Sequence, residues 1–224
     1  MTNVHIPYLE RFTIEAMAMN LVNATFGKDA VHEPCIIDIH YLAEFQLNAT
    51  IDYHRLSTDD TILGLSVLRD GKVNTFGPRG GKRRVQLSEN TIVLDSKALA
   101  DSPECRERFT VAHECGHLHL HKKCFEHTNS VLAPIQEHRV DPLDGCEMPQ
   151  KYASSAEWQA NQFGAALLMP QPAFRLAFKD LAPGGWFSIE DQSEKEDIVQ
   201  ALADLFGVSR QSVAIRIDTL KLAA

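Results

Sequence analysis

The sequence predicts a mixed α+β fold, because helical and strand-like hydrophobic patterns occupy different parts of the chain. Residues 11–26 and 154–170 repeat apolar side chains at helical spacing, whereas residues 60–95 contain short apolar runs separated by turn residues. Four histidines also fall within residues 113–121, in a stretch that is itself helical in pattern. Together these observations indicate helices around a small sheet, with possible metal ligands on one helix.

The composition is that of a globular protein with a real core. The chain has 224 residues, 44% of them hydrophobic, which suits one domain or one domain with a small appendage. A net charge of −8 argues against nucleic-acid binding over the whole surface and leaves a local basic patch possible. No apolar run long enough to span a membrane and no secretory signal is visible, so we expect a cytoplasmic protein. The five cysteines, without a CxxC pair, do not indicate a disulfide framework.

The first elements are expected to be helices. Residues 11–26 form the first one, and Gly27 is a plausible cap at its end. A second helical pattern over residues 37–47 places four apolar side chains on one face: Ile37, Tyr41, Leu42 and Phe45.

The pattern then changes to that of strands. The stretch from Thr61 to Gly77 reads as a strand, a tight turn at Asp70-Gly71 and a second strand. Residues 83–95 contain two apolar runs around a Ser-Glu-Asn interruption, which suggests another hairpin. Residues 60–95 are therefore predicted to be a small, mostly antiparallel sheet.

Helices are expected again from Ser102, which can cap, and Pro103, which suits a first helical position. This helix should run to about residue 121. Residues 122–153 read as a long irregular loop, which is uncommon unless it covers or builds a site. A strong helical pattern follows over 154–170, and the chain ends in a helix, a turn at residues 206–208 and another helix.

The stretch His113-Glu114-Cys115-Gly116-His117 fits the pattern H-E-x-x-H. Residues four apart on a helix project from one face, so both imidazoles can reach a single metal ion. Glu114 lies beside that face, where it can take a proton from a water that the metal has made acidic. Apolar residues surround the motif and predict a buried helix, on which unpaired polar side chains would be costly. A metal would supply the missing partner.

Spacing gives alternative roles to the other residues near this motif. His119 points nearly opposite His117, whereas His121 follows one turn later and is expected to support the site or pack beside it. Glu157 is the candidate third ligand, with Asn161 one turn later as a hydrogen-bond partner for a ligand. Alternatively, Ser154 and Glu157 form a capping box at the helix start, and spacing alone leaves both readings open.

Three stretches of the sequence resemble ordered motifs of the ImmA/IrrE family of zinc metallo-endopeptidases. They are "RFTVAHECGHLHLH", "EWQANQFGAALLMP" and "LFGVSRQSVAIRI", and the resemblance spans roughly residues 35–220. It implies that His113 and His117 bind zinc, that Glu157 is the third ligand and that Glu114 is the catalytic base. The implied fold is a gluzincin-like α+β peptidase core with a small antiparallel or mixed sheet.

The same resemblance implies a protein substrate, namely a helix-turn-helix repressor or antitoxin-like regulator, cut in a bacterium or mobile element. An extended peptide would be held by strand addition at the sheet edge, which we expect around Ile92, Val93 and Leu94. Tyr152 or a loop histidine is a candidate to stabilise the oxyanion.

Two departures from the family pattern stand out. Residues 122–153 look inserted and offer Cys124, His127, His138 and Cys146 as competing metal ligands. Gly164 stands where the family has alanine, a change we expect to be neutral.

The resemblance implies three regions: a helical extension (1–33), the zinc peptidase core (34–180, with the inserted loop) and a helix-turn-helix-like segment (188–224). A DNA-reading segment would use Arg210, Gln211, Ser212 and Arg216, but its acidic surroundings would repel phosphate, so we expect no nucleic-acid partner. The alternative to a peptidase is a non-catalytic zinc-containing regulator that acts by protein or DNA contacts through these helices.

Overall fold

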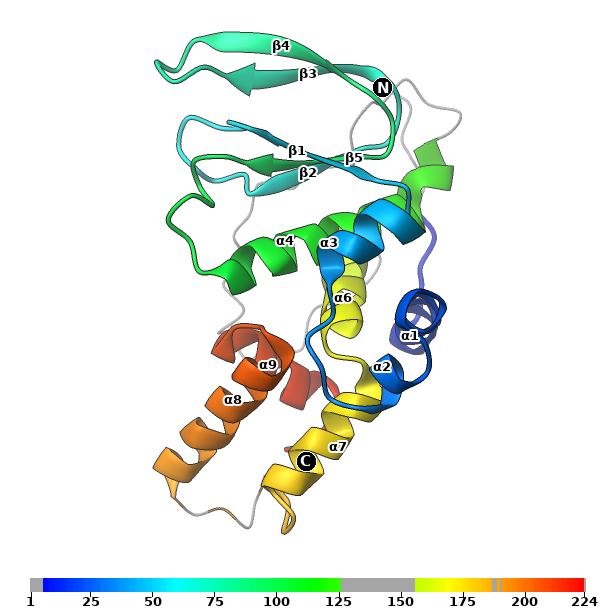
Figure 1. Cartoon of the computed structure of the whole chain (residues 1–224), viewed down its shortest axis with the longest axis vertical. Coiled ribbons are helices and arrows are strands. Elements are labelled where there is room, and N and C mark those ends of the chain that lie inside the picture. Colours follow the sequence, from blue (N-terminus) through cyan, green and yellow to red (C-terminus); the bar gives the residue numbers. More distant parts are fainter. Residues whose placement is uncertain (1–5, 126–155, 187–188, 190, 224) are drawn as a thin grey trace.

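The computed structural model describes residues 6–125, 156–186, 189 and 191–223. Helices make up one end of the molecule and two layers of strands lie at the other (Figure 1). The fold is thus mixed α+β, as predicted. None of the described helices is long and apolar enough to cross a membrane.

A three-stranded sheet lies directly against the helices. Strands β1 (Thr50–His54), β5 (Thr91–Asp95) and β2 (Gly64–Val67) are arranged in that order, with β1 parallel and β2 antiparallel to β5. Every residue of β5 is buried. The prediction that Ile92, Val93 and Leu94 form a sheet edge is therefore wrong, because β5 is hydrogen-bonded on both sides. Its unbroken apolar run is typical of a strand with both faces covered.

A separate antiparallel hairpin, β3 (Gly71–Phe76) and β4 (Lys82–Leu87), covers the other face of this sheet. A small apolar cluster joins the two layers: Leu56, Leu65, Val67, Val73, Leu87 and Val93. The strands on either side of Asp70-Gly71 exist, but β2 pairs with β5 and not with β3. The predicted hairpin of residues 83–95 is wrong for the same reason, since β4 and β5 belong to different layers.

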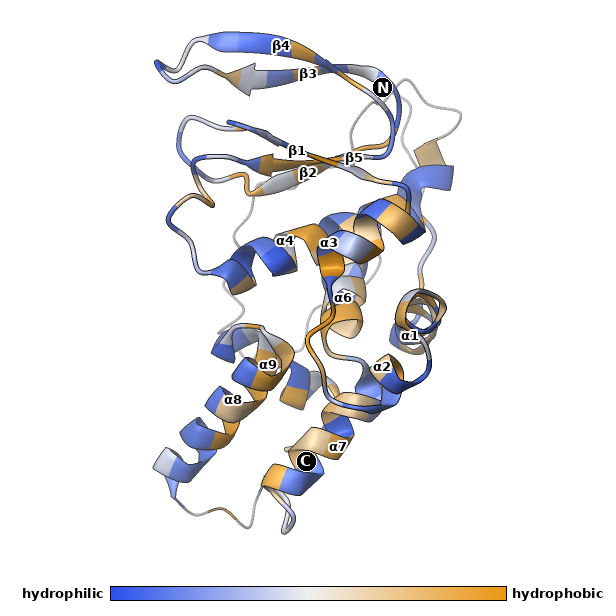
Figure 2. Cartoon of the chain, in the orientation of Figure 1, coloured by the Kyte–Doolittle hydropathy of each residue, from blue (hydrophilic) through white to orange (hydrophobic). Residues whose placement is uncertain are grey.

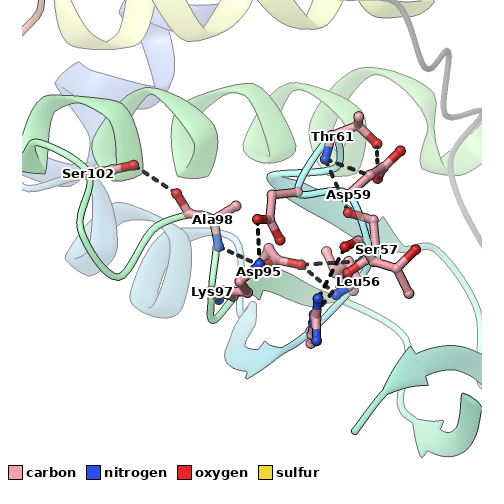
Figure 3. A network of polar contacts seen from close by, with 11 residues as sticks. Leu56, Ser57, Asp59, Thr61, Asp95, Lys97, Ala98 and Ser102 are labelled. Atoms are coloured by element: carbon pink, nitrogen blue, oxygen red, sulfur yellow. Dashed lines mark hydrogen bonds and ion pairs between the residues drawn. The ribbon is translucent and has the colours of Figure 1, made fainter. Parts of the chain in front are cut away.

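The carboxylate of Asp95 organises the end of β5 (Figure 3). One oxygen accepts hydrogen bonds from the backbone nitrogens of Leu56 (2.5 Å) and Ser57 (3.4 Å). The other accepts from those of Lys97 (2.9 Å) and Ala98 (2.7 Å). Asp95 thus ties the β1–β2 connection to the turn that leads into the next helix.

The N-terminal helices pack against the rest of the fold rather than standing apart. Helix α1 (Arg11–Phe26) is followed by α2 (Asp29–His32) and by α3 (Ile39–Tyr41), which continues as the π-helical turn η1 (Leu42–Gln46). The buried face of α1 belongs to the main core. The expectation of one apolar face over residues 37–47 is wrong in part: Ile37 and Leu42 are buried, whereas Tyr41 and Phe45 are exposed and stack on one another.

Helices α4 and α6 cross closely at the centre of the molecule. Helix α4 (Glu104–Gly116) continues as a π-helical turn η2 (His117–His121) and a 3₁₀ turn η3 (Lys122–Phe125), and α6 spans Ala156–Leu168. A Cβ on Gly116 would lie 2.8 Å from Cα of Ala160, so only glycine allows this approach. A Cβ on Gly164 would lie 3.0 Å from the backbone nitrogen of His113. Alanine at 164 would therefore require the backbone of α4 to move by a few tenths of an ångström.

The C-terminal region contains α7 (Gln171–Leu181), α8 (Gln192–Phe206) and α9 (Arg210–Thr219). Gly207 ends α8 in the left-handed conformation, at the predicted turn. Arg216 on α9 is buried, forms an ion pair with Glu15 of α1 and donates to the carbonyl of Met169 (2.7 Å). Arg216 is thus unavailable to DNA, so it is not one of the residues that a DNA-reading segment could use.

Candidate metal centre

Three side chains from α4, η2 and α6 point into one site. Nε2 of His113 and Nε2 of His117 are 3.1 Å apart. Glu157 faces both, with 3.3 Å from one carboxylate oxygen to His113 and 3.3 Å from the other to His117. These residues form the only group of potential metal ligands found in the described part of the chain.

The spacing of these donor atoms suits a metal ion. Zinc binds nitrogen and oxygen ligands at about 2.0–2.1 Å, so neighbouring ligands of a tetrahedral zinc lie about 3.3–3.4 Å apart. The nitrogens are 3.1 Å apart, and each lies 3.3 Å from a different oxygen of Glu157, so one ligand atom of each residue lies within 4.8 Å of the others. Two imidazoles and one carboxylate therefore fit a zinc ion that keeps a fourth position for a water or a substrate.

A chain of buried hydrogen bonds fixes which nitrogen of His117 carries the proton. The amide nitrogen of Gln159 donates to the carbonyl of Pro7 (2.9 Å), so the amide oxygen of Gln159 faces Nε2 of His121 (3.1 Å). Nε2 of His121 must then donate, and Nδ1 of neutral His121 accepts from Nδ1 of His117 (3.1 Å). Nε2 of His117 is left with a free lone pair, which is the form that binds a metal.

His113 has an equivalent partner. Its Nδ1 lies 2.9 Å from the amide oxygen of Asn161 and donates to it, so its Nε2 is also left as an acceptor. Asn161 and His121 thus contact the two histidines at the atoms that face away from the site, where the sequence placed them as supporting residues.

The charges of the site are coupled. Burial by itself would raise the pKa of the Glu157 carboxyl, but when the metal-free imidazoles are protonated on both nitrogens, their Nε2 atoms donate to Glu157 and lower that pKa to about 2. Burial would lower the pKa of His113, yet the hydrogen bond with Glu157 and nearby carboxylates raise it overall. Burial, aided by the neighbouring His117, lowers the pKa of His121 to about 4. Glu157 is therefore ionised and His121 neutral at pH 7, as the hydrogen-bond chain requires.

Glu114 is held against strand β2. The hydroxyl of Ser66, which is fully buried, lies 2.6 Å from one carboxylate oxygen of Glu114 and 3.0 Å from its backbone carbonyl. A Cβ on Gly64 would lie 3.1 Å from the other carboxylate oxygen and 2.7 Å from Thr110, so glycine lets β2 approach α4 here. The carboxylate is also near enough to contribute to the raised pKa of His113.

Several predicted residues lie elsewhere. His119 stacks on Phe163, with ring centroids 5.2 Å apart, and takes no part in the donor group. Cys124 is half-buried and also outside that group. The remaining loop candidates and the capping residue lie outside the described residues: His127, His138, Cys146, Tyr152 and Ser154. The contacts of Glu157 with both histidines nevertheless favour the ligand reading over the capping reading.

Sequence reasoning missed Ser66, Gln159 and Gly64. Ser66 and Gly64 occupy alternate positions of the stretch Gly-Leu-Ser, where small residues on one side of a strand signal close packing. Gln159 is a polar residue two positions after Glu157, between the apolar residues Trp158 and Ala160. A polar side chain in that setting signals a buried partner.

The comparison with protein families agrees with this geometry. The model of the IrrE N-terminal-like domain, peptidase family M78, matches residues 79–218, which is well over half of the chain. The match includes α4, η2 and α6, and hence all three potential metal ligands, His113, His117 and Glu157. No curated protein matches the chain. The resemblance noted in the sequence is confirmed: the chain belongs to the peptidase M78 family of IrrE N-terminal-like domains.

Proposed function

We propose that this protein is a zinc-dependent endopeptidase. The observation that carries the proposal is the convergence of two imidazole nitrogens and a carboxylate, whose donor atoms lie within 4.8 Å of one another. Family membership supports a metallopeptidase-like domain. A zinc ion bound there would polarise the peptide carbonyl and lower the pKa of a water.

The side chains around the ion have separate roles in the proposed reaction. His113, His117 and Glu157 hold the ion, while Asn161 and His121 keep the two imidazoles in the required tautomers. Glu114 is the base that takes the proton of the attacking water and returns it to the leaving amine. Ser66 positions the Glu114 carboxylate for that transfer.

We further propose that the substrate is a protein regulator, either a helix-turn-helix repressor or an antitoxin-like protein. This part rests on the resemblance to the ImmA/IrrE motifs and not on the geometry of the site. A regulator encoded beside this protein is the first substrate to test.

Two variants test the proposal. The Glu114→Gln protein should keep its zinc and lose cleavage of the regulator, because an amide cannot accept the proton. The Glu157→Ala protein should lose zinc, whereas a capping role predicts full zinc and only lower thermal stability. If Glu114→Gln cleaves as well as the wild type, or if the zinc-loaded wild type cleaves nothing, the protein is a non-catalytic zinc-containing regulator.

A further inference from the structure

The basic residues of this acidic protein gather on one hairpin. Residues 69–86 contain six lysines and arginines and a single acidic residue, in a chain whose net charge is −8. This segment holds β3, β4 and the turn between them, and it forms one end of the molecule (Figure 1). Charge is therefore divided between a positive hairpin and a strongly negative body.

The strand register decides where these side chains point. Lys72 pairs with Gln86, Asn74 with Arg84 and Phe76 with Lys82, and residues at alternate positions of a strand share a face. The opposite face contains Val73, which is buried against the sheet below. The outward face thus carries five exposed polar side chains: Lys72, Asn74, Lys82, Arg84 and Gln86. Figure 2 shows much of β4 as hydrophilic.

The tip of the hairpin adds two further cations. The turn is closed by a hydrogen bond from Gly77 to the carbonyl of Gly81 (2.8 Å). Beside it lies a hollow of about 350 Å³, lined by Gly77, Pro78, Arg79, Gly81 and Arg83. The Arg83 side chain lies across the turn, since a Cβ on Gly77 would be 3.2 Å from its Nε. Two guanidinium groups and no carboxylate line this hollow.

These cations have no acidic partners among the residues that the structure describes. Ion pairs are formed elsewhere by Lys97, Lys122, Arg210 and Arg216. Among the residues that the structure describes, none of the hairpin cations Lys72, Arg79, Lys82, Arg83 and Arg84 forms one. Five like charges on one small surface repel each other, and an external polyanion would relieve that repulsion.

We propose that the outward face and tip of the β3–β4 hairpin bind duplex DNA. A two-stranded ribbon fits the major groove of B-DNA, and lysine, arginine, asparagine and glutamine are the side chains that contact phosphates and base edges there. No exposed large hydrophobic residue lies on the hairpin, whereas protein interfaces are anchored by apolar and aromatic side chains. The deep, narrow major groove of A-form RNA does not admit such a ribbon.

The proposal reverses the expectation drawn from net charge, because the charge is not spread evenly. It also differs from a helix-turn-helix mode of binding. In the C-terminal helices Arg216 is buried and Arg210 lies 3.7 Å from Glu196, so little free positive charge remains there. The proposal does not depend on peptidase activity.

Fluorescence anisotropy of the full zinc-loaded chain with a labelled DNA duplex tests it, at salt concentrations between about 50 and 200 mM. If all five cations meet phosphates, the slope of log K against log salt approaches about −4.5. The double variant Lys82→Gln, Arg84→Gln should lower the magnitude of that slope by about 1.8 and weaken binding about tenfold. The matched control Lys179→Gln, Arg210→Gln makes the same change in net charge on exposed residues of α7 and α9 and should bind as the wild type does.

Each outcome of this experiment decides the matter. Absence of salt-dependent binding, or a hairpin variant that binds as tightly as the wild type, overturns the proposal. Equal affinity for an RNA duplex overturns the assignment to DNA. Circular dichroism and zinc content establish that the variants are folded. Glu114→Gln should bind DNA like the wild type, so failure of the peptidase proposal and failure of this one are distinguishable.

Discussion

The substitution Gln159→Leu tests whether the buried hydrogen-bond chain sets the metal affinity. Leucine has a similar volume and leaves little cavity, so the change is chiefly the loss of the amide. Nε2 of His121, which is fully buried, then has no acceptor, and an unsatisfied buried donor costs about 1–3 kcal/mol of stability. His121 can now carry its proton on Nδ1 instead, which forces His117 to present a protonated Nε2 to the site.

Loss of such a supporting partner weakens metal affinity about 10- to 100-fold, or roughly 1.4–2.7 kcal/mol. Competition of the protein with a chromophoric chelator measures the zinc Kd, and denaturant unfolding of the metal-free protein measures its stability. The matched control is Gln162→Leu on the same helix, where the buried amide oxygen has no partner among the described residues. It should leave the zinc Kd unchanged. If Gln159→Leu lowers stability and keeps the wild-type zinc Kd, the buried hydrogen bonds contribute only to packing. They then do not set the metal affinity through the tautomer of His117.

Three further predictions follow from the contacts. Ser66→Ala should lower kcat by about 10- to 150-fold with zinc content unchanged, because the hydrogen bond to the Glu114 carboxylate contributes about 1.5–3 kcal/mol. An equal fall in zinc content would contradict a positioning role. Glu15→Ala should destabilise the protein to denaturant by about 3–5 kcal/mol, since it leaves Arg216 charged and buried. The control Glu196→Ala, in an exposed pair, should change stability by less than about 1 kcal/mol. The metal-free protein should lose stability as the pH falls from about 6.5 to 4, by up to about 3 kcal/mol. The pKa of His121 is lowered to about 4 in the folded state, so the unfolded chain takes up the proton first; His121→Gln should show a shallower pH dependence, and an unchanged one would refute this cause.

The site was predictable where it depends on local helix geometry. His113 and His117 are four residues apart on one helix, so their common face follows from spacing alone. Glu157 lies on another helix, and spacing left its role open until the resemblance was added. Ser66 and Gln159 were missed because their partners, Glu114 and His121, are distant in sequence. The sequence pattern within one helix or strand does not indicate which distant element packs against it.

In the sheet, too, local features were predictable from the sequence and long-range pairing was not. The strands of residues 60–95 were recognisable from their apolar runs and turn residues, whereas their order was not. Proximity in sequence favoured hairpins at Asp70-Gly71 and before β5. The protein instead places β3 and β4 in a second layer, which buries Val93 and Leu65 from the side opposite the helices. Strand β1, which pairs in parallel with β5, carried no signal that we read as a strand.

The ion pair between Glu15 and Arg216 has a consequence for biosynthesis. The two residues are 201 positions apart, and Arg216 also holds the end of α6 through Met169. During translation α1 and the histidine helix leave the ribosome long before α9 exists. Glu15 cannot settle into its apolar surroundings without a counter-charge, so the core around α6 closes only when synthesis is nearly finished. A nascent or truncated chain therefore lacks the ion pair that joins α1 to α9 beside the end of α6.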